Sequence, residues 1–282
     1  MDSEGRRGEG AERDLMNSEQ RRTAKDIDRL ENQKENRSEE RIRLNKFIAS
    51  SGYYSRREAD RLIEEGYVTV DGEKAVPGMT VSGKETVMVK NHHVHPIRRK
   101  VVVAYYKPVG VTVTREDPHA EVTIQDVFHY PVPLRYAGRL DRDSEGLLLM
   151  TNDGDLINAM MRSANHHEKE YVVRTKTKIG DDDLKQMSKG IWLKDLNVKT
   201  RPCKVERLGK TAFRIVLTQG LNRQIRRMCR ARGLEVKSIK RVRVLNVTLR
   251  GLKPGTYREL SEKEMKRLYE LAGYDEARIY GT

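Results

Sequence analysis

The stretch from Gly138 to Gly154 restricts the fold of this chain more than any other. It is a polar, glycine-bounded turn that carries two carboxylates, Asp141 and Asp143, and leads into four consecutive apolar residues. That apolar run predicts a buried strand, which Asn152-Asp153-Gly154 would end with a turn. A carboxylate at the mouth of a buried strand, beside arginines, is a frequent position for a catalytic acid. An ordinary loop closed by a surface ion pair fits the same residues equally well.

Charge and apolar content divide the chain near residue 40. The first 40 residues hold nine Lys and Arg against twelve Asp and Glu, and they lack aromatic residues. Such a segment cannot bury a core, so we expect residues 1–40 to be a disordered charged tail. Because the whole chain has a net charge of +14, the rest of it carries +17. A folded part this basic, without a long apolar segment, indicates a polyanionic partner and no membrane.

Cysteines and histidines give no sign of a disulfide framework or a metal centre. Cys203 and Cys229 are too few for either and are typical of a reducing compartment. His93 and His95 lie in a stretch, 91–100, that we interpret as a solvated linker, because no nearby carboxylate or cysteine would complete a metal shell. The N-terminus is charged throughout and predicts no signal peptide. We expect a cytoplasmic, monomeric protein without a bound metal.

Residues 41–98 predict a small helical module with a hairpin. Apolar positions 44, 47 and 48 mark one helix, and Ser55 with Glu58 forms a capping box that starts a second. Asp71-Gly72 then predicts a tight hairpin turn. The exposed positions of both helices carry cations and no acid, a pattern that suits a phosphate backbone. These cations are Arg43, Lys46, Arg56, Arg57 and Arg61.

From residue 99 onward the pattern alternates between strands and helices. An apolar run predicts a strand that Lys107-Pro108 ends, and Lys107 is either structural or faces the polyanion. Tyr171 begins another strand, where a tyrosine is most often a core residue with a satisfied hydroxyl. Alternation over 191–218 predicts further strands, and residues 219–230 have a helical period with arginines between the apolar positions. Basic residues at 237–243 extend a positive surface along a strand.

Four segments resemble the RNA pseudouridine synthases of the RsuA, RluB and RluF branch. They are G-R-L-D-x-D-S-x-G-L-L-L from Gly138, K-P-V-G at 107–110, K-E-Y-V-V at 169–173 and Q-G-L-N-R-Q-I-R-R-M-C at 219–229. The last two are most similar to the RluF group. Residues 41–90, with S-R-R-E-A at 55–59, resemble the S4 RNA-binding domain. One departure is Tyr106, which stands where the family usually has asparagine.

The resemblance implies an α+β chain of three parts. These are a tail at 1–40, an S4 RNA-binding domain with its linker at 41–98, and a pseudouridine synthase catalytic domain at 99–282. The catalytic domain would have a mixed, largely antiparallel central sheet flanked by helices. Its active site would lie in a basic cleft across that sheet.

The resemblance also implies the residues of the site. The first aspartate of the loop, Asp141, would be catalytic, and Tyr171 would stack on a base that has left its neighbours. Arg226 would pair with Asp141, and Ile225 would pack beside the nucleoside. Two further arginines are expected to bind the substrate, Arg139 and, one helical turn from Arg226, Arg223. The reaction is an isomerisation, so no cofactor is expected.

The expected function is isomerisation of one uridine to pseudouridine in 23S ribosomal RNA, in the peptidyl-transferase region. It would proceed by base flipping and aspartate-assisted cleavage and re-formation of the glycosidic bond. The RNA would be free, part of a pre-ribosomal particle, or a transfer RNA. A divalent ion on the D-x-D pair would instead indicate a glycosyltransferase-like site. A non-catalytic S4-type ribosome-assembly factor is the other alternative, although Asp141, Tyr171 and Arg226 are all present.

Overall fold

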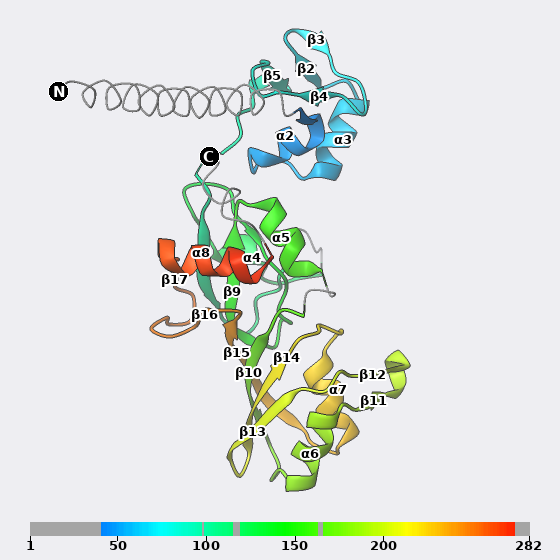
Figure 1. The fold of residues 1–282 in the computed structure, drawn as a ribbon, viewed down its shortest axis with the longest axis vertical. Coiled ribbons are helices and arrows are strands. Elements are labelled where there is room, and N and C mark those ends of the chain that lie inside the picture. Colours follow the sequence, from blue (N-terminus) through cyan, green and yellow to red (C-terminus); the bar gives the residue numbers. More distant parts are fainter. Residues whose placement is uncertain (1–40, 98, 115–118, 163–165, 274–282) are drawn as a thin grey trace, which may run out of the picture. The chain divides into compact units, whose positions relative to one another are not determined.

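The computed structural model describes residues 41–97, 99–114, 119–162 and 166–273. The expected tail at 1–40 lies outside these residues. The chain divides into two compact units between Pro96 and Ile97 (Figure 1). No helix in the described ranges is long and apolar enough to cross a membrane.

The first unit packs two helices, α2 (Leu44–Ser50) and α3 (Arg56–Glu64), against short antiparallel strands. Four strands pair in the order β3-β2-β5-β6, and β1 pairs with β4. Leu44, Leu62 and Val87 meet in the core and are at most 1% exposed. The strands are β1 (Ile42–Arg43), β2 (Val68–Val70), β3 (Glu73–Lys74), β4 (Thr80–Val81), β5 (Val87–Val89) and β6 (His92–His93).

Two predicted features of this unit are confirmed, and a third, the linker, differs from the prediction at residues 92–93. Ser55 Oγ accepts from the Glu58 N–H, and the Glu58 carboxylate accepts from the Ser55 N–H, so the capping box starts α3. Asp71 and Gly72 have positive φ angles of 52° and 87°, which suits the tight hairpin between β2 and β3. The linker predicted at 91–100 is partly structured, because the backbone of β6 adds an edge strand to β5. That pairing is made by main-chain groups, so the polar side chains of this segment give no sign of it.

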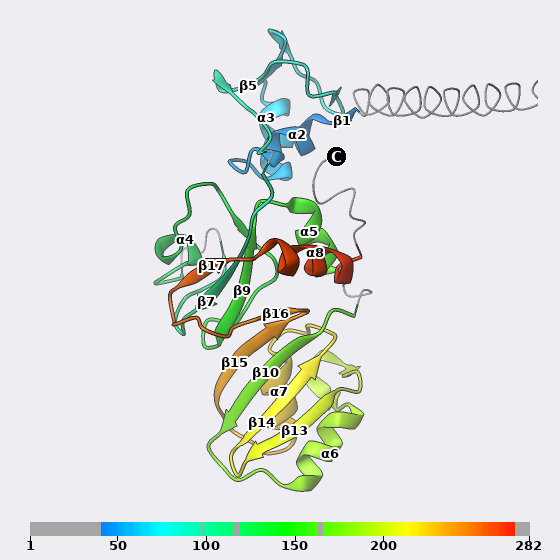
Figure 2. The same cartoon turned by 60° about the vertical axis from the view of Figure 1, so that its left-hand side comes forward.

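The second unit is built on a nine-stranded sheet (Figure 2). The main path runs β13-β14-β10-β15-β9-β7-β17, with β16 on β15 and β8 on β9. The strands of the sheet are β7 (Val102–Lys107), β8 (Arg135–Tyr136), β9 (Glu145–Thr151), β10 (Lys169–Thr175), β13 (Lys204–Gly209), β14 (Ala212–Leu217), β15 (Val236–Val244), β16 (Val247–Thr248) and β17 (Tyr257–Glu259). The α-helices are α4 (Ile124–Val127), α5 (Gly154–Met161), α6 (Asp181–Lys189), α7 (Gln224–Ala231) and α8 (Glu262–Leu271).

Every pairing in this sheet is antiparallel except that of β9 with β15. The expected mixed, largely antiparallel sheet is therefore confirmed. The parallel pair joins the two halves of the sheet through Glu145 opposite Lys240 and Gly146 opposite Arg241. Gly146 has a φ of 112°, and a Cβ there would lie 2.3 Å from the Arg241 carbonyl oxygen. Only glycine allows the two backbones to approach this closely.

The strands predicted from apolar runs and alternation are confirmed. Residues 147–150 form the centre of β9 and are at most 2% exposed. In β14 the alternate positions Phe213, Ile215 and Leu217 are buried, as expected for a strand with one covered face.

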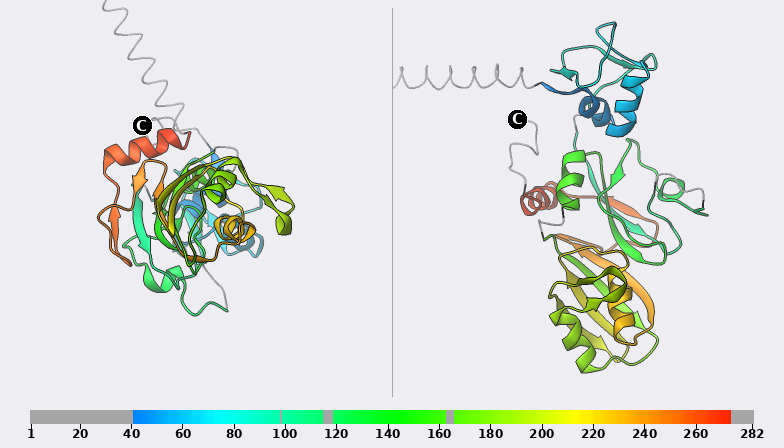
Figure 3. Two further views of the ribbon diagram at one scale, coloured as in Figure 1. Left: turned by 90° about the horizontal axis from the view of Figure 1, so that it is seen from below. Right: turned by 90° about the vertical axis from the view of Figure 1, so that its right-hand side faces the viewer.

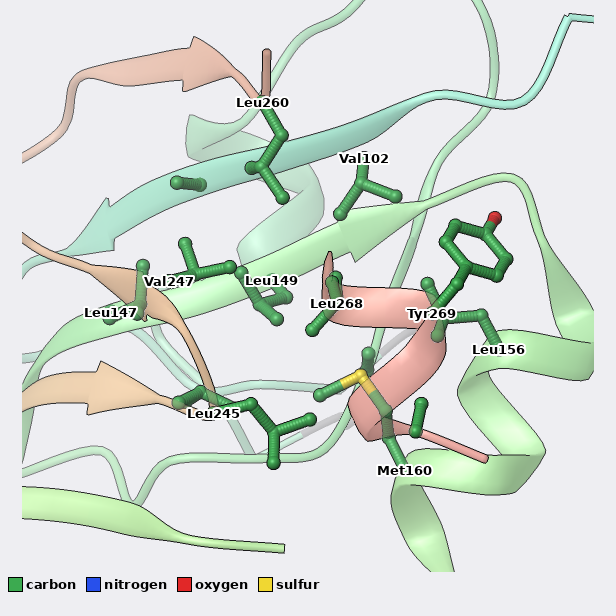
Figure 4. Close-up of a cluster of buried hydrophobic side chains, with 14 of the residues drawn as sticks. Val102, Leu147, Leu149, Leu156, Met160, Leu245, Val247, Leu260, Leu268 and Tyr269 are labelled. Atoms are coloured by element: carbon green, nitrogen blue, oxygen red, sulfur yellow. The ribbon is translucent and has the colours of Figure 1, made fainter. Parts of the chain in front are cut away.

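Each half of the sheet has its own helical cover. On the β9-β7-β17 half, α5 and α8 lie on one side, green and red in the right-hand view of Figure 3. Leu156 of α5 and Leu268 of α8 pack there against Leu149 of β9 (Figure 4). Ile124 of α4 covers the opposite face. On the other half, α6 and α7 pack together on one face, where Met228 is fully buried.

Candidate active site

The loop that leads into β9 presents Asp141 at a tight turn. The N–H of Ser144 donates to the Asp141 carbonyl oxygen at 3.1 Å, and the N–H of Gly110 donates to the Arg142 carbonyl oxygen at 2.8 Å. Asp141 itself is partly buried. Its carboxylate makes no hydrogen bond or ion pair with any other residue in the described ranges. The backbone of the loop is therefore fixed, while this carboxylate has no partner among the described residues.

The second aspartate of the loop, Asp143, binds two of the three arginines expected at the site. Arg223 donates to its two carboxylate oxygens at 3.3 and 2.9 Å. Nη2 of Arg226 lies 3.1 Å from Oδ2 of Asp143 and donates to the Asp143 carbonyl oxygen at 2.9 Å. Burial raises the pKa of Asp143, but the hydrogen bond from Arg223 and the charge of Arg226 outweigh it and hold that pKa below its usual range.

The expected pair between Arg226 and Asp141 is not formed in the structure. A D-x-D turn offers two carboxylates, and the one that faces the start of α7 is Asp143. Arg223 also differs from the expectation, because it precedes α7 in a left-handed conformation with a φ of 49° instead of lying within the helix. Such a conformation costs an ordinary residue roughly 1 kcal/mol or more, which the paired hydrogen bonds to Asp143 offset.

A buried lysine holds the loop by hydrogen bonds to backbone carbonyl oxygens. Lys107 at the end of β7 is fully buried, and its Nζ donates to the carbonyl oxygens of Pro108, Val111 and Arg142 at 2.8, 2.8 and 3.4 Å. Burial lowers the pKa of Lys107 to about 8, although the nearby charges of Asp143 and Asp141 oppose that shift. Of the two alternatives for Lys107, the structure shows the structural one.

A buried arginine holds both ends of the loop. Arg241 is 2% exposed, and it donates from Nε to the Leu147 carbonyl oxygen at 2.7 Å and from Nη1 to the Arg139 carbonyl oxygen at 3.3 Å. Its Nη2 is buried without a partner among the described residues. The interpretation of 237–243 as a continuous basic surface is wrong at Arg241, because the contact of β15 with Gly146 directs this side chain under the loop.

Tyr171 lies where the two halves of the sheet meet, and Ile225 lies in the apolar cluster of one half. Tyr171 pairs across β10 and β15 with Arg241, so both side chains lie on the same face. Tyr171 is partly buried and packs against the apolar clusters of both halves. Ile225, on the first turn of α7, is 6% exposed and belongs to one of these clusters. The carbonyl oxygen of Arg139 accepts a hydrogen bond from Arg241, and the side chain of Arg139 is exposed.

The departure at Tyr106 is explained by its contacts. Its hydroxyl donates to Oε2 of Glu145 at 2.7 Å, and Nζ of Lys240 lies 5.4 Å from its ring centroid. The tyrosine hydroxyl thus makes a polar contact with Glu145, the first residue of β9, so position 106 still carries a polar group.

The cations of the first unit lie on its surface, with one exception. Arg43, Arg56, Arg57 and Arg61 are exposed, and Lys46 is half-buried. The expectation of a face without acids is wrong. Arg61 lies 3.7 Å from Glu65, one helical turn on. Asp60 is also exposed and accepts a hydrogen bond from Asn45 at 2.8 Å.

Two residues that hold the loop are not among the site residues that the sequence predicts, although both have a signal in it. Lys107 ends an apolar run, where a lysine is either at the surface or satisfied by backbone oxygens. Arg241 is two positions from the buried Ile239 and so shares its face in a strand of period two. Within the described ranges, no group of three or more His, Cys, Asp or Glu side chains could hold a metal ion.

Comparison with known proteins agrees with this arrangement. One family model, described as RNA pseudouridylate synthase, matches residues 101–231, and an S4 domain model matches residues 42–87. The chain is 42% identical to the dual-specificity RNA pseudouridine synthase RluF of Escherichia coli K12, over 82% of this chain and 79% of that protein. It is 36% identical to ribosomal large subunit pseudouridine synthase B of Bacillus subtilis, over 82% of this chain and 97% of the relative.

A solved structure is also similar. A crystal structure titled as a pseudouridylate synthase aligns with a TM-score of 0.60 at 28% identity, covering 80% of this chain and 99% of that one. The matches extend over both units and over the loop that carries Asp141. The chain therefore belongs to the RNA pseudouridine synthases, as an RluF-like member in which an S4 domain precedes the catalytic domain.

Proposed function

We propose that this enzyme converts one uridine of 23S ribosomal RNA, in the peptidyl-transferase region, to pseudouridine. A large-subunit substrate is supported by the name of the Bacillus subtilis relative. A net charge of +17 beyond residue 40 supports a large, structured polyanion. The exposed arginines of α3 would contact its phosphates. We further propose that the enzyme works as a cytoplasmic monomer.

The observation that carries the catalytic assignment is the difference between the two aspartates of the loop. Asp143 is held by Arg223 and Arg226 and is thereby committed to joining the loop to α7. Asp141, two residues earlier, has no such partner in the part of the chain that the structure describes, although Lys107 and Arg241 hold the backbone around it. A carboxylate on a fixed backbone with free oxygens is placed to act on a substrate.

The reaction would proceed on a uridine turned out of its stack. Tyr171 would stack on the base, with Ile225 packing beside it. Asp141 would act on the ribose, either as a nucleophile at C1′ or as the base for a sugar proton, while the bond from N1 to C1′ breaks. The uracil would turn and form a bond from C5 to C1′. Where Asp141 has attacked C1′, its bond to C1′ breaks as C5 bonds there, and where it has taken a sugar proton, it returns that proton to the sugar. C5 would then lose its proton and N1 would take one up, so that atoms balance and no oxidant is needed.

Tritium release tests the proposal. Transcripts of 23S rRNA, 16S rRNA and transfer RNA, each labelled with tritium at uridine C5, would be incubated with wild-type enzyme and with Asp141→Asn. The proposal predicts release from the 23S transcript that contains the peptidyl-transferase region, and none with Asp141→Asn. Release from 16S rRNA or transfer RNA alone would contradict the substrate assignment. Tight binding of all transcripts without release would favour the non-catalytic assembly factor.

A further inference from the structure

The single tryptophan of the chain lies exposed on a two-stranded arm beside α7. The arm consists of β11 (Trp192–Leu193) and β12 (Val198–Lys199), joined by a 3₁₀ turn at Lys194–Leu196 and labelled in Figure 1. Trp192 is 53% exposed, whereas Leu193, the next residue, is 2% exposed. A large aromatic ring on a protein surface is typical of a binding contact, because exposure of its apolar face to water is unfavourable.

The arm is fixed to the body of the second unit. At its base, the N–H of Thr200 donates to the Ile191 carbonyl oxygen at 2.9 Å, and the N–H of Ile191 donates to Thr200 Oγ1 at 2.9 Å. Leu193 is buried in the apolar cluster formed by α6, α7 and the sheet. The exposure of Trp192 is therefore a property of an ordered strand with one buried face.

The exposed face of the arm combines an aromatic ring with positive charge. Trp192 and Lys199 are direct partners across the two strands, so their side chains lie on the same face. Lys194, on the turn, is also exposed. Neither ammonium group forms an ion pair with a described residue. The acid of the turn, Asp195, is paired with Arg227. A flat ring beside an unpaired cation matches the two parts of a nucleotide, its base and its phosphate.

The arm and the catalytic loop are attached to the same turn of α7. Arg227 pairs with Asp195 of the arm, and Arg226, the preceding residue, binds Asp143 of the loop. Arg227 is itself fixed by a hydrogen bond from Nε to the Asn222 carbonyl oxygen at 2.8 Å. Ion pairs of two consecutive residues of α7 therefore connect the arm and the catalytic loop to one helical turn.

We propose that the arm binds an unpaired nucleotide that flanks the target uridine. The indole of Trp192 stacks on its base, and the ammonium of Lys199 pairs with its phosphate. This inference rests on the RNA pseudouridine synthase activity and adds to it a residue pair that selects substrates with an unpaired neighbour. Stacking tolerates every base, so the arm selects an unstacked nucleotide more than a particular sequence.

Kinetics with matched variants give the first test. Tritium release would be measured on a 23S rRNA transcript that spans the peptidyl-transferase region, for Trp192→Ala, Trp192→Phe and Lys199→Ala. Leu208→Ala serves as control, because Leu208 is a 42% exposed apolar side chain at the end of β13. Trp192→Ala should lower kcat/KM about 5- to 150-fold, the range expected for loss of one stacked base, through KM alone. Trp192→Phe should keep most activity, and Leu208→Ala all of it.

Fluorescence gives a second test that does not need turnover. Because Trp192 is the only tryptophan, its emission reports directly on the arm. Stacking predicts quenching that saturates as the transcript binds, and less quenching by a fully paired duplex of the same region. Unchanged emission at saturating RNA, or an unchanged KM for Trp192→Ala, would overturn the proposal. If wild-type enzyme released no tritium, the substrate assignment would fail, whereas the fluorescence titration would still decide whether Trp192 stacks on RNA.

Discussion

Replacement of Arg241 by methionine should separate catalysis from stability in this enzyme. The guanidinium donates to the carbonyl oxygens of Arg139 and Leu147, which lie on either side of Asp141 in the loop. Methionine fills a similar length without any donor. Both carbonyl oxygens then lose their partner, and the loop loses the two hydrogen bonds that fix the position of Asp141.

The size of each effect follows from these contacts. Two hydrogen bonds from a charged donor contribute roughly 1.5–3 kcal/mol each. The substitution also removes the cost of burying Nη2 without a partner, and this stabilises the variant by about 1–3 kcal/mol. The middle of each range gives a net loss of about 2–3 kcal/mol, or a fall in Tm of about 4–12 °C for a unit of this size. A displacement of the loop by about 1 Å would lower kcat about 100-fold.

Thermal unfolding and the kcat of tritium release at saturating RNA would be measured on the same samples. Arg241→Lys should fall between wild type and Arg241→Met, because one ammonium cannot reach both carbonyl oxygens. Tyr269→Phe is the matched control, since it removes the buried 2.8 Å hydrogen bond to Asp153, which lies beyond β9, away from the loop. It should lower Tm and leave kcat unchanged. A kcat for Arg241→Met within twofold of wild type, with a lowered Tm, would show that Arg241 does not set the position of Asp141.

Three further predictions address the loop, its buried lysine and the RNA surface. Gly146→Ala should destabilise the protein by about 2–6 kcal/mol through backbone overlap and its positive φ, whereas Gly209→Ala, with open space around it, should be nearly neutral in thermal melts. Because Lys107 has a pKa of about 8 when folded, the native state binds fewer protons than the unfolded chain above that pH. The unfolding free energy from denaturant titrations should then rise by up to about 3 kcal/mol towards pH 10, a rise that Lys107→Met should lack. Replacing Arg56 and Arg57 by alanine should raise KM and flatten the slope of log affinity against log salt by about 1.5–2, and an unchanged slope would exclude them as phosphate contacts.

Local patterns predicted the elements of this fold, because local chemistry determines them. The apolar run after the loop could only be a buried strand, and Asp71-Gly72 required a tight hairpin. The polar side chains of His92–His93 favour a linker, because the pairing of this segment with β5 depends on main-chain groups that side-chain polarity does not report. The helix over 219–230 was placed too early, since Arg223 adopts a left-handed conformation and α7 starts at Gln224.

Contacts within the site were harder to predict because they join distant segments. Asp141 and Asp143 are equivalent in sequence, and only the position of α7 decides which of them receives the arginines. Arg241 was expected on a basic surface, and the parallel contact of β15 with β9 places it inside. Such a contact across the two halves of the sheet leaves no local signature except the glycine at 146.

The most direct test of the account compares Asp141→Asn with Asp143→Asn in single-turnover tritium release, with RNA binding measured in parallel. Both substitutions keep the size of the side chain and remove its charge. We expect Asp141→Asn to lower the rate at least about 1,000-fold with RNA binding intact. Asp143→Asn, which weakens the attachment of the loop to Arg223 and Arg226, should lower it only about 10-fold. Full activity of Asp141→Asn, or a loss confined to Asp143→Asn, would contradict the assignment of Asp141 as the catalytic residue.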